Sequence, residues 1–135
     1  MNVSHTVAMK LWVDVFGSEE WAQDCFGTWM HKDAYSNQPV MKIRPGYSKE
    51  YDYSWNVDHI RPTASYENPN DSHFMNNYEP MHRQNNVEKS DDYEHFNIEG
   101  KKYVVFKQDG YNGYGIRNVQ TGKDIDWKSK QKRNY

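Results

Sequence analysis

The hydrophobic residues near the start of this chain recur with a helical period. They are Val7, Leu11, Trp12 and Val15. Spacings of three and four residues place such side chains on one face of an α-helix. Ser4 precedes them, and a serine hydroxyl at this position can accept a hydrogen bond from a backbone N–H of the first turn. The pattern therefore predicts an N-terminal helix with one apolar face.

A second group of helix signals follows directly. Ser18 precedes two glutamates, which are favoured in a first helical turn, and Gly17 and Gly27 suit helix ends. We therefore expect a second helix, which would pack beside the first. Between residues 28 and 53, Asn, Pro and Gly interrupt the pattern, so we expect irregular structure there with one short strand at residues 40–44.

The middle of the chain alternates between apolar and polar residues, which is the period of a half-buried strand. The apolar positions are Tyr53, Trp55 and Val57, and the polar ones are Ser54, Asn56 and Asp58. A second short strand is expected at residues 79–82, and residues 83–90 predict a helix. The segment between the two strands is rich in Pro, Asn, Asp and Ser, which is typical of a surface loop.

Alternation returns in the last third, where glycine-rich and Thr-Gly turns separate two or three short strands. We expect a small antiparallel sheet between residues 95 and 127. Its tyrosines, Tyr103, Tyr111 and Tyr114, suit either a core or a platform for nucleic-acid bases, and we expect core. The predicted fold class is α+β, with N-terminal helices, a central strand–strand–helix unit and a small C-terminal antiparallel sheet.

Length and composition favour one small domain. The 135 residues are 36% hydrophobic, which predicts a thin core, and 16% aromatic, which compensates because aromatic side chains bury large areas. Within this single domain, 1–135, we expect four parts: residues 1–52, 53–92, 93–127 and a basic tail at 128–135. There is no apolar run of about 20 residues and no signal-peptide pattern, so we expect a cytoplasmic protein without a membrane partner.

The chemistry of the chain is concentrated in the sequence WNVDHI at residues 55–60. A histidine suits the deprotonation of water near neutral pH, and His59 ends the first predicted strand of the unit. Carboxylate and amide oxygens suit a hard divalent cation, and Asp58 and Asn86 can supply them. Neighbouring side chains on a strand point to opposite faces, so Asp58 and His59 can share a site only where the strand ends. The Arg61–Pro62 step supplies such an end.

These residues carry a family resemblance over about residues 53–92. The order of Asp58, His59, Asn77 and Asn86, followed by Lys89, resembles the HNH endonucleases, which have a ββα-metal fold. The nine-residue spacing from Asn77 to Asn86 and the ending NVEKSD are closest to the HNH domain of CRISPR effector nucleases. The resemblance implies that Asp58 and Asn86 bind a metal, that His59 is the general base, and that Asn77 orients the base and fixes the loop.

The resemblance also implies an Mg²⁺ or Mn²⁺ cofactor and a DNA substrate. Many family members carry two Cys pairs that bind a structural zinc, but this chain has one cysteine, Cys25, so no structural zinc is expected. The Gly-Gly often found in the intervening loop is also absent. We expect Arg83 and Lys89, on the predicted helix, to flank the metal and bind phosphate. His82 has a possible functional role on the second strand, whereas His31, His73 and His95 stand alone and are expected to be ordinary surface or core residues.

Charge is unevenly distributed along the chain. Residues 51–100 contain 3 basic and 10 acidic residues, and residues 101–135 contain 9 basic and 3 acidic ones. Because an acidic surface repels phosphate, DNA must be attracted from elsewhere. The basic tail offers Lys128, Lys130, Lys132 and Arg133 as contacts to a DNA backbone. The alternative is a solvated tail that only improves solubility.

Two functions are consistent with this pattern. The first is a metal-dependent endonuclease that hydrolyses DNA phosphodiester bonds. The second is a binding protein of phage or mobile-element origin that uses the same scaffold to engage a nuclease or another host protein, with little or no catalysis. The acidic motif region and the aromatic surplus motivate the second, whereas Asp58, His59, Asn77 and Asn86 in one register favour the first.

Overall fold

The computed structural model describes residues 3–92, 94–108 and 113–133 and has a mixed α and β architecture with small antiparallel sheets. The first element, α1 (His5–Phe16), forms where the helical period predicts it. The Ser4 hydroxyl accepts a hydrogen bond from the Val7 N–H at 3.2 Å. The helix ends at Gly17, which has a φ of 65° and whose N–H donates to the Val13 carbonyl.

The predicted second helix is wrong, because a β-hairpin occupies its place. The hairpin consists of β1 (Trp21–Gln23) and β2 (Trp29–His31). The reason lies in its turn, where the Asp24 carboxylate accepts hydrogen bonds from the Phe26 N–H at 3.0 Å and the Thr28 N–H at 2.9 Å. An aspartate that bonds the backbone ahead of it favours a turn over a helix. Gly27, with a φ of 87°, closes this turn.

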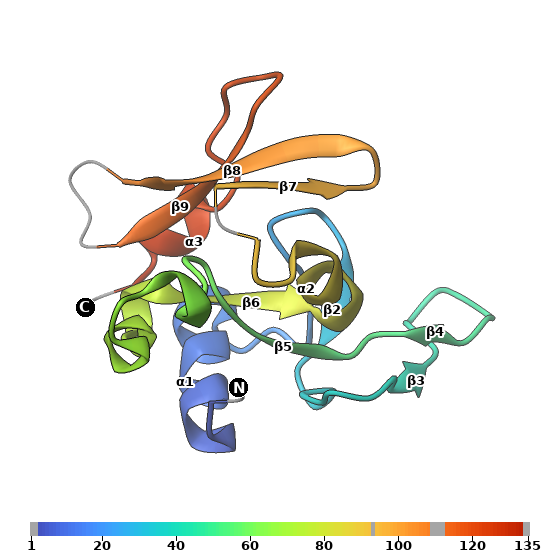
Figure 1. Cartoon of the computed structure of the whole chain (residues 1–135). Helices are drawn as coiled ribbons and strands as arrows, with labels where there is room; N and C mark the ends of the chain where they lie inside the picture. Colours follow the sequence, from blue (N-terminus) through green and yellow to red (C-terminus); the bar gives the residue numbers. More distant parts are fainter. Residues whose placement is uncertain (1–2, 93, 109–112, 134–135) are drawn as a thin grey trace.

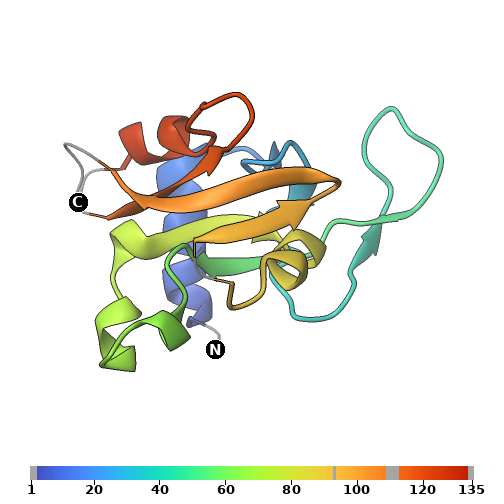
Figure 2. The ribbon, with the colours of Figure 1, turned by 45° about the horizontal axis from the view of Figure 1, so that its top comes forward.

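Residues 38–52 form an arm that extends away from the rest of the molecule, as Figures 1 and 2 both show. Its two short strands are β3 (Met41–Lys42), inside the predicted strand at residues 40–44, and β4 (Tyr51–Asp52). At the base of the arm, the Asp52 carboxylate accepts a hydrogen bond from the Val40 N–H at 3.1 Å. Arg83 pairs with the other oxygen of Asp52 at 2.8 Å, so the arm is anchored to the body of the protein.

The central unit has the predicted order of strand, strand and helix. Its members are β5 (Trp55–His59), β6 (Tyr78–His82) and α2 (Arg83–Lys89), and β5 pairs with β6 in antiparallel register, with Asp58 opposite Glu79. Three short 3₁₀ turns lie between the strands: η1 (Thr63–Ser65), η2 (Pro69–Ser72) and η3 (Met75–Asn77). The chain thus leaves β5, makes a compact loop and returns along β6 directly into α2.

The C-terminal part forms the predicted antiparallel sheet. Its strands are β7 (His95–Ile98), β8 (Lys101–Lys107) and β9 (Tyr114–Asn118), in the order β7-β8-β9. Tyr103 is buried in the core, as expected, while Tyr114 is half-buried and its hydroxyl accepts a hydrogen bond from Arg61 at 2.8 Å. Tyr111 lies outside the described residues. A last helix, α3 (Trp127–Gln131), follows.

The β5–β6 pair lies between two hydrophobic clusters, and Figure 1 shows α1 on one side of it and the C-terminal sheet on the other. On the α1 side, the rings of Trp12 and Trp55 lie 5.0 Å apart. On the other side, Met81 packs with Phe96 and its neighbours of the C-terminal sheet. All five residues of β6 are buried because both of its faces are covered. Among the described residues, no helix has the length and apolar character needed to span a bilayer.

Candidate active site

A cleft of about 350 Å³ opens at the C-terminal end of β5. Asp58 and His59 from β5, and Asn86 from α2, all line it, so the structure brings three of the four motif residues into one place. The loop after β5 forms one wall through Pro62 and Thr63. The family resemblance implied that these residues share one site, and all three line this cleft.

The end of β5 explains how two consecutive residues share the cleft. Strand pairing ends at His59, opposite Tyr78, and the Ile60 N–H then donates to the backbone carbonyl of Asn77 at 2.8 Å. Asp58 faces α2, while the His59 ring lies 5.0 Å from the ring of Tyr78 on the other side. The strand end was the expected condition for this arrangement, and the chain does turn at Arg61 and Pro62.

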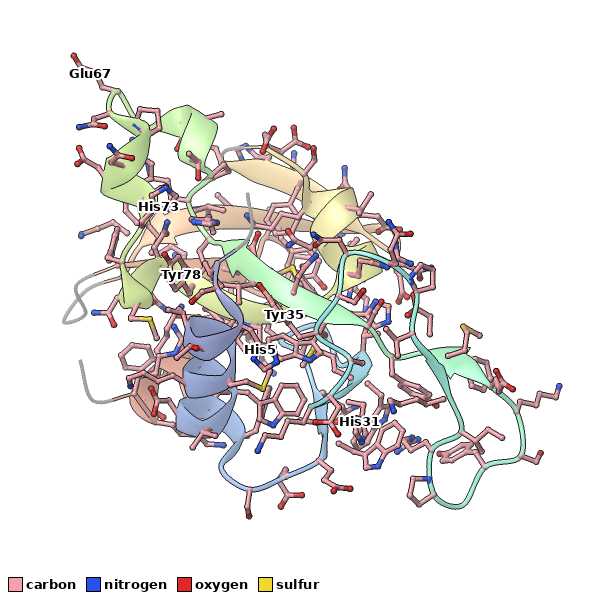
Figure 3. The ribbon with its side chains drawn as sticks, turned by 90° about the horizontal axis from the view of Figure 1, so that it is seen from below. His5, His31, Tyr35, Glu67, His73 and Tyr78 are labelled. Carbon is pink, nitrogen blue, oxygen red and sulfur yellow. The ribbon has the colours of Figure 1, made fainter. Side chains whose placement is uncertain are left out.

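The His59 side chain contacts a second histidine, for which the sequence predicted no functional role. Nε2 of His59 lies 3.1 Å from Nδ1 of His73, and Figure 3 shows His73 beside Tyr78, on the loop that precedes β6. Burial lowers the pKa of His59 to about 4, and the neighbouring His73 and Lys89 contribute to this shift. His59 is therefore neutral at pH 7 and able to accept a proton. His73, expected to be an ordinary residue, is part of the site.

Asp58 is buried and carries one oxygen with no partner. Its Oδ1 accepts from Nζ of Lys89 at 3.2 Å, whereas its Oδ2 has no hydrogen-bond partner among the described residues. Burial raises the pKa of Asp58, and the Lys89 ammonium opposes that rise. An orphaned carboxylate oxygen is costly unless something else satisfies it, and a cation is one candidate.

Asn86 presents the second candidate ligand. Its side-chain N–H donates to Oδ1 of Asn56 at 2.6 Å. No described residue donates to Oδ1, the side-chain carbonyl oxygen of Asn86. Asn56 lies two positions before Asp58, on the same face of β5. The alternation of β5 was a signal that could have identified Asn56, which the motif does not include.

The donors present fit a hard divalent cation. They are the Asp58 carboxylate and the side-chain carbonyl of Asn86, which belong to two residues that line the cleft, and oxygen donors are what Mg²⁺ and Mn²⁺ prefer. Within residues 3–92, 94–108 and 113–133, no group of three or more His, Cys, Asp or Glu side chains is arranged as a metal site. Two protein ligands are still sufficient for Mg²⁺, which usually retains several waters.

Asn77 fixes the loop between the strands. Its side-chain N–H group donates to the backbone carbonyls of Arg61 and Ser72, each at 3.0 Å, and its Oδ1 accepts from the Arg61 N–H at 3.0 Å. Asn77 is fully buried. The resemblance implied both an orienting and a loop-fixing role. The hydrogen bonds support loop fixing, and the described side chain that hydrogen-bonds to the His59 imidazole is instead His73.

Lys89 occupies a different place from the expected one. Rather than facing phosphate, its ammonium is completely buried and donates to the backbone carbonyls of His59 and Ile60, at 3.2 and 2.9 Å, as well as to Asp58. The helical spacing correctly places Lys89 near Asn86. Its side chain turns inward because the buried Asp58 carboxylate and the two strand-end carbonyls need a donor.

Arg83 and His82 also have structural partners. Arg83 pairs with Asp52, and its Nε donates to the Ser54 hydroxyl at 3.0 Å, so it braces the arm rather than flanking the cleft. His82 caps α2, since its Nδ1 accepts from the Gln84 N–H at 3.1 Å. Its Nε2 therefore carries the proton and donates to the Asp52 carbonyl at 2.8 Å. His82 was expected to have a possible functional role, and its contacts are instead those of a helix cap.

The four cations of the predicted basic tail differ in their exposure. Lys128 and Lys132 are exposed, but Lys130 and Arg133 are buried against Glu79 of β6, with Nζ of Lys130 3.8 Å and Nη2 of Arg133 3.2 Å from its carboxylate. Arg133 also donates to the Tyr78 carbonyl. The expectation that all four cations contact DNA is thus corrected for Lys130 and Arg133, because a buried carboxylate requires nearby cations.

We compared the chain with models of known protein families, with curated proteins and with solved structures, and none of them matches.

Proposed function

We propose that this protein is a metal-dependent endonuclease of the HNH type that hydrolyses DNA phosphodiester bonds. One observation carries the proposal: His59, which is neutral at pH 7, lines the same cleft as two residues with oxygen donors, Asp58 and Asn86. A general base beside two oxygen ligands is the combination that phosphodiester hydrolysis requires. The order of β5, β6 and α2 around this cleft supports the family resemblance.

His59 is the base in this proposal. If its Nε2–H donates to Nδ1 of His73, the lone pair on Nδ1 of His59 is left to accept a proton from water. The water oxygen then attacks phosphorus as that proton moves to Nδ1, and the bond from phosphorus to the leaving oxygen breaks. His73 is a positioning residue here, because it fixes the tautomer and the orientation of the base.

Asp58 and Asn86 would hold the cation. A divalent cation bound there supplies Lewis-acid stabilisation of the negative charge that develops on the leaving oxygen. Lys89 assists cation binding, because its ammonium opposes the effect of burial on the Asp58 pKa and so favours the ionised carboxylate. Asn77 keeps the loop wall of the cleft in place through its bonds to Arg61 and Ser72.

The test is nicking of supercoiled plasmid by purified protein with Mg²⁺, Mn²⁺ or a chelator. We expect cleavage with either metal, none with chelator, and a loss of at least about 100-fold in the His59→Ala variant. The matched control is His95→Ala, since His95 is an exposed histidine on β7 that does not line the cleft. Cleavage by His59→Ala at the rate of the His95→Ala control would exclude His59 as the base.

A further inference from the structure

The arm carries two faces of different chemistry. Lys42 of β3 pairs with Tyr51 of β4, so these side chains share one face. Met41 lies on the opposite face, and both Met41 and the adjoining Ile43 are 52% exposed. One face of the arm therefore carries Lys42 and Tyr51, and the exposed pair Met41 and Ile43 is named the apolar face of the arm.

A groove of about 500 Å³ lies between the arm and the body of the protein, and the arm lines it with Arg44, Tyr47, Tyr51 and Asp52. The guanidinium of Arg44 lies 4.0 Å from the ring centre of Trp29 and 4.2 Å from that of Tyr47. Tyr51 and Tyr53 complete an aromatic wall, and Tyr47 and Tyr51 remain 54% and 51% exposed. Half-exposed aromatic rings beside a cation form a surface on which flat, unpaired bases can stack.

Charge complementarity favours a polyanion. The arm contains Lys42, Arg44 and Lys49, and the described residues offer none of the three an ion-pair partner. Asp52 is already paired with Arg83, which leaves Glu50 as the opposing charge on the arm. In a molecule whose motif region is strongly acidic, this arm is a basic surface adjoining the candidate site.

The groove and the cleft flank the same helix. Gln84, in the first turn of α2, lines the groove, and Asn86 and Ser90, at its end, line the cleft. Along β5, the distance from Tyr53 to His59 is about 20 Å at ~3.3 Å per residue. Stacked bases spaced by ~3.4 Å cover that distance with about six nucleotides.

We propose that this groove binds a single-stranded segment of DNA, with its bases against Tyr47 and Tyr51 and its phosphates near Lys42, Arg44 and Lys49. This inference rests on the proposed endonuclease function and adds to it that the DNA leading to the cleft is single-stranded. Unpaired bases are favoured over a duplex because only they expose the ring faces that stack on aromatic side chains. A protein partner would instead cover Met41 and Ile43 on the apolar face.

The experiment measures binding in the His59→Ala background, so that the result does not depend on cleavage. Fluorescence anisotropy of a labelled 12-nucleotide oligothymidine gives the Kd of three proteins. They are the His59→Ala variant, the same variant with Tyr47→Ala and Tyr51→Ala added, and the same variant with the apolar-face control Ile43→Ser added. We expect the tyrosine pair to weaken binding about tenfold or more and the control to leave it within about twofold. Circular dichroism melts confirm that each exposed substitution leaves the fold intact.

Several outcomes overturn the inference. They are an absence of oligonucleotide binding, tighter binding of a duplex of the same length, or equal binding by the tyrosine variant. A loss confined to Ile43→Ser would place the contact on the apolar face, which suits a protein partner. A tyrosine-dependent affinity without any plasmid nicking would retain the inference and exclude the catalytic proposal, so the two failures are distinguishable.

Discussion

Nε2 of His59 lies 3.1 Å from Nδ1 of His73, and the two rings meet edge to face with their centres 5.2 Å apart. The pair joins the end of β5 to the loop that precedes β6, 14 residues later. One proton serves this contact, because a second proton between the two nitrogens would be repelled. In the proposed reaction, the tautomer and orientation of the base His59 are thus fixed by His73, a residue outside the sequence motif.

The first prediction concerns pH. Only neutral His59 can accept a proton, and its pKa is lowered from 6.5 to about 4 by burial, with contributions from His73 and Lys89. Since the neutral form persists above the folded pKa, the rate of plasmid nicking should stay constant as pH falls through 6.5 and decline only near 4. A pH profile of kcat/KM for a short oligonucleotide tests this. A decline centred near 6.5 would show that the base is not in this environment.

The second prediction is that His73→Ala lowers the nicking rate by about 10- to 100-fold. The loss follows because His59 would no longer have a partner to fix its tautomer. The acid limb of the pH profile should also move upward, since His73 is one of the groups that lower the pKa of His59. His95→Ala is the control for both readouts. A reduced rate with an unmoved acid limb would indicate that His73 acts only through the stability of the loop.

The third prediction concerns Lys89 and the free energy of unfolding. Lys89→Met would leave the buried Asp58 carboxylate without its cation and two strand-end carbonyls without a donor. We expect a loss of about 3–5 kcal/mol by chemical denaturation. Adding Asp58→Asn should recover part of that loss, because the uncompensated charge is then removed. If the double variant were no more stable than Lys89→Met, charge burial would not be the cause.

The fourth prediction concerns acid stability at the base of the arm. Burial alone would raise the pKa of Asp52, but hydrogen bonds from Ser54 and Arg83 outweigh it and lower the pKa from 3.8 to about 2. A lowered carboxyl pKa stabilises the fold above the unfolded value, and that contribution is lost as pH falls from about 4 to 2.

Comparison of Asp52→Asn with the wild type measures this contribution. After discounting for partial solvent exposure, we expect the variant to be about 1–2 kcal/mol less stable at pH 6 and the difference to narrow below pH 4. Asp33→Asn, at an exposed position, should change stability little. An undiminished difference at pH 2.5 would assign the effect of Asp52 to hydrogen bonding rather than to its charge.

The central unit was predictable because its signals are local. The alternation around Trp55 and Val57 and the turn at Pro62 determine β5 and its end, and β6 and α2 agree with expectation to within one residue at each boundary. The hairpin of β1 and β2 was not predictable, and Ser18 wrongly predicted a helix there, because the side-chain bonds of Asp24 stabilise a turn that propensity does not reveal. The hairpin there is further supported by packing on α1.

Other residues of the site depend on tertiary contacts. His73 reaches His59 through the path of a loop, which a periodic pattern does not specify. Lys89 and Lys130 look like surface cations in the sequence, and only the positions of Asp58 and Glu79 show that both are buried. Charge totals by segment therefore overestimated the cations available for DNA at the C-terminus.

The position of Arg133 has a consequence for the order of synthesis. Its guanidinium contacts Glu79 and the Tyr78 carbonyl, more than 50 residues earlier on β6. A nascent chain that has emerged only through α2 contains every residue of the motif, yet Glu79 would have neither of its cations. Because β6 pairs with β5 and carries that carboxylate, the strand pair at the cleft acquires its full set of contacts only after residues 130–133 have been synthesised.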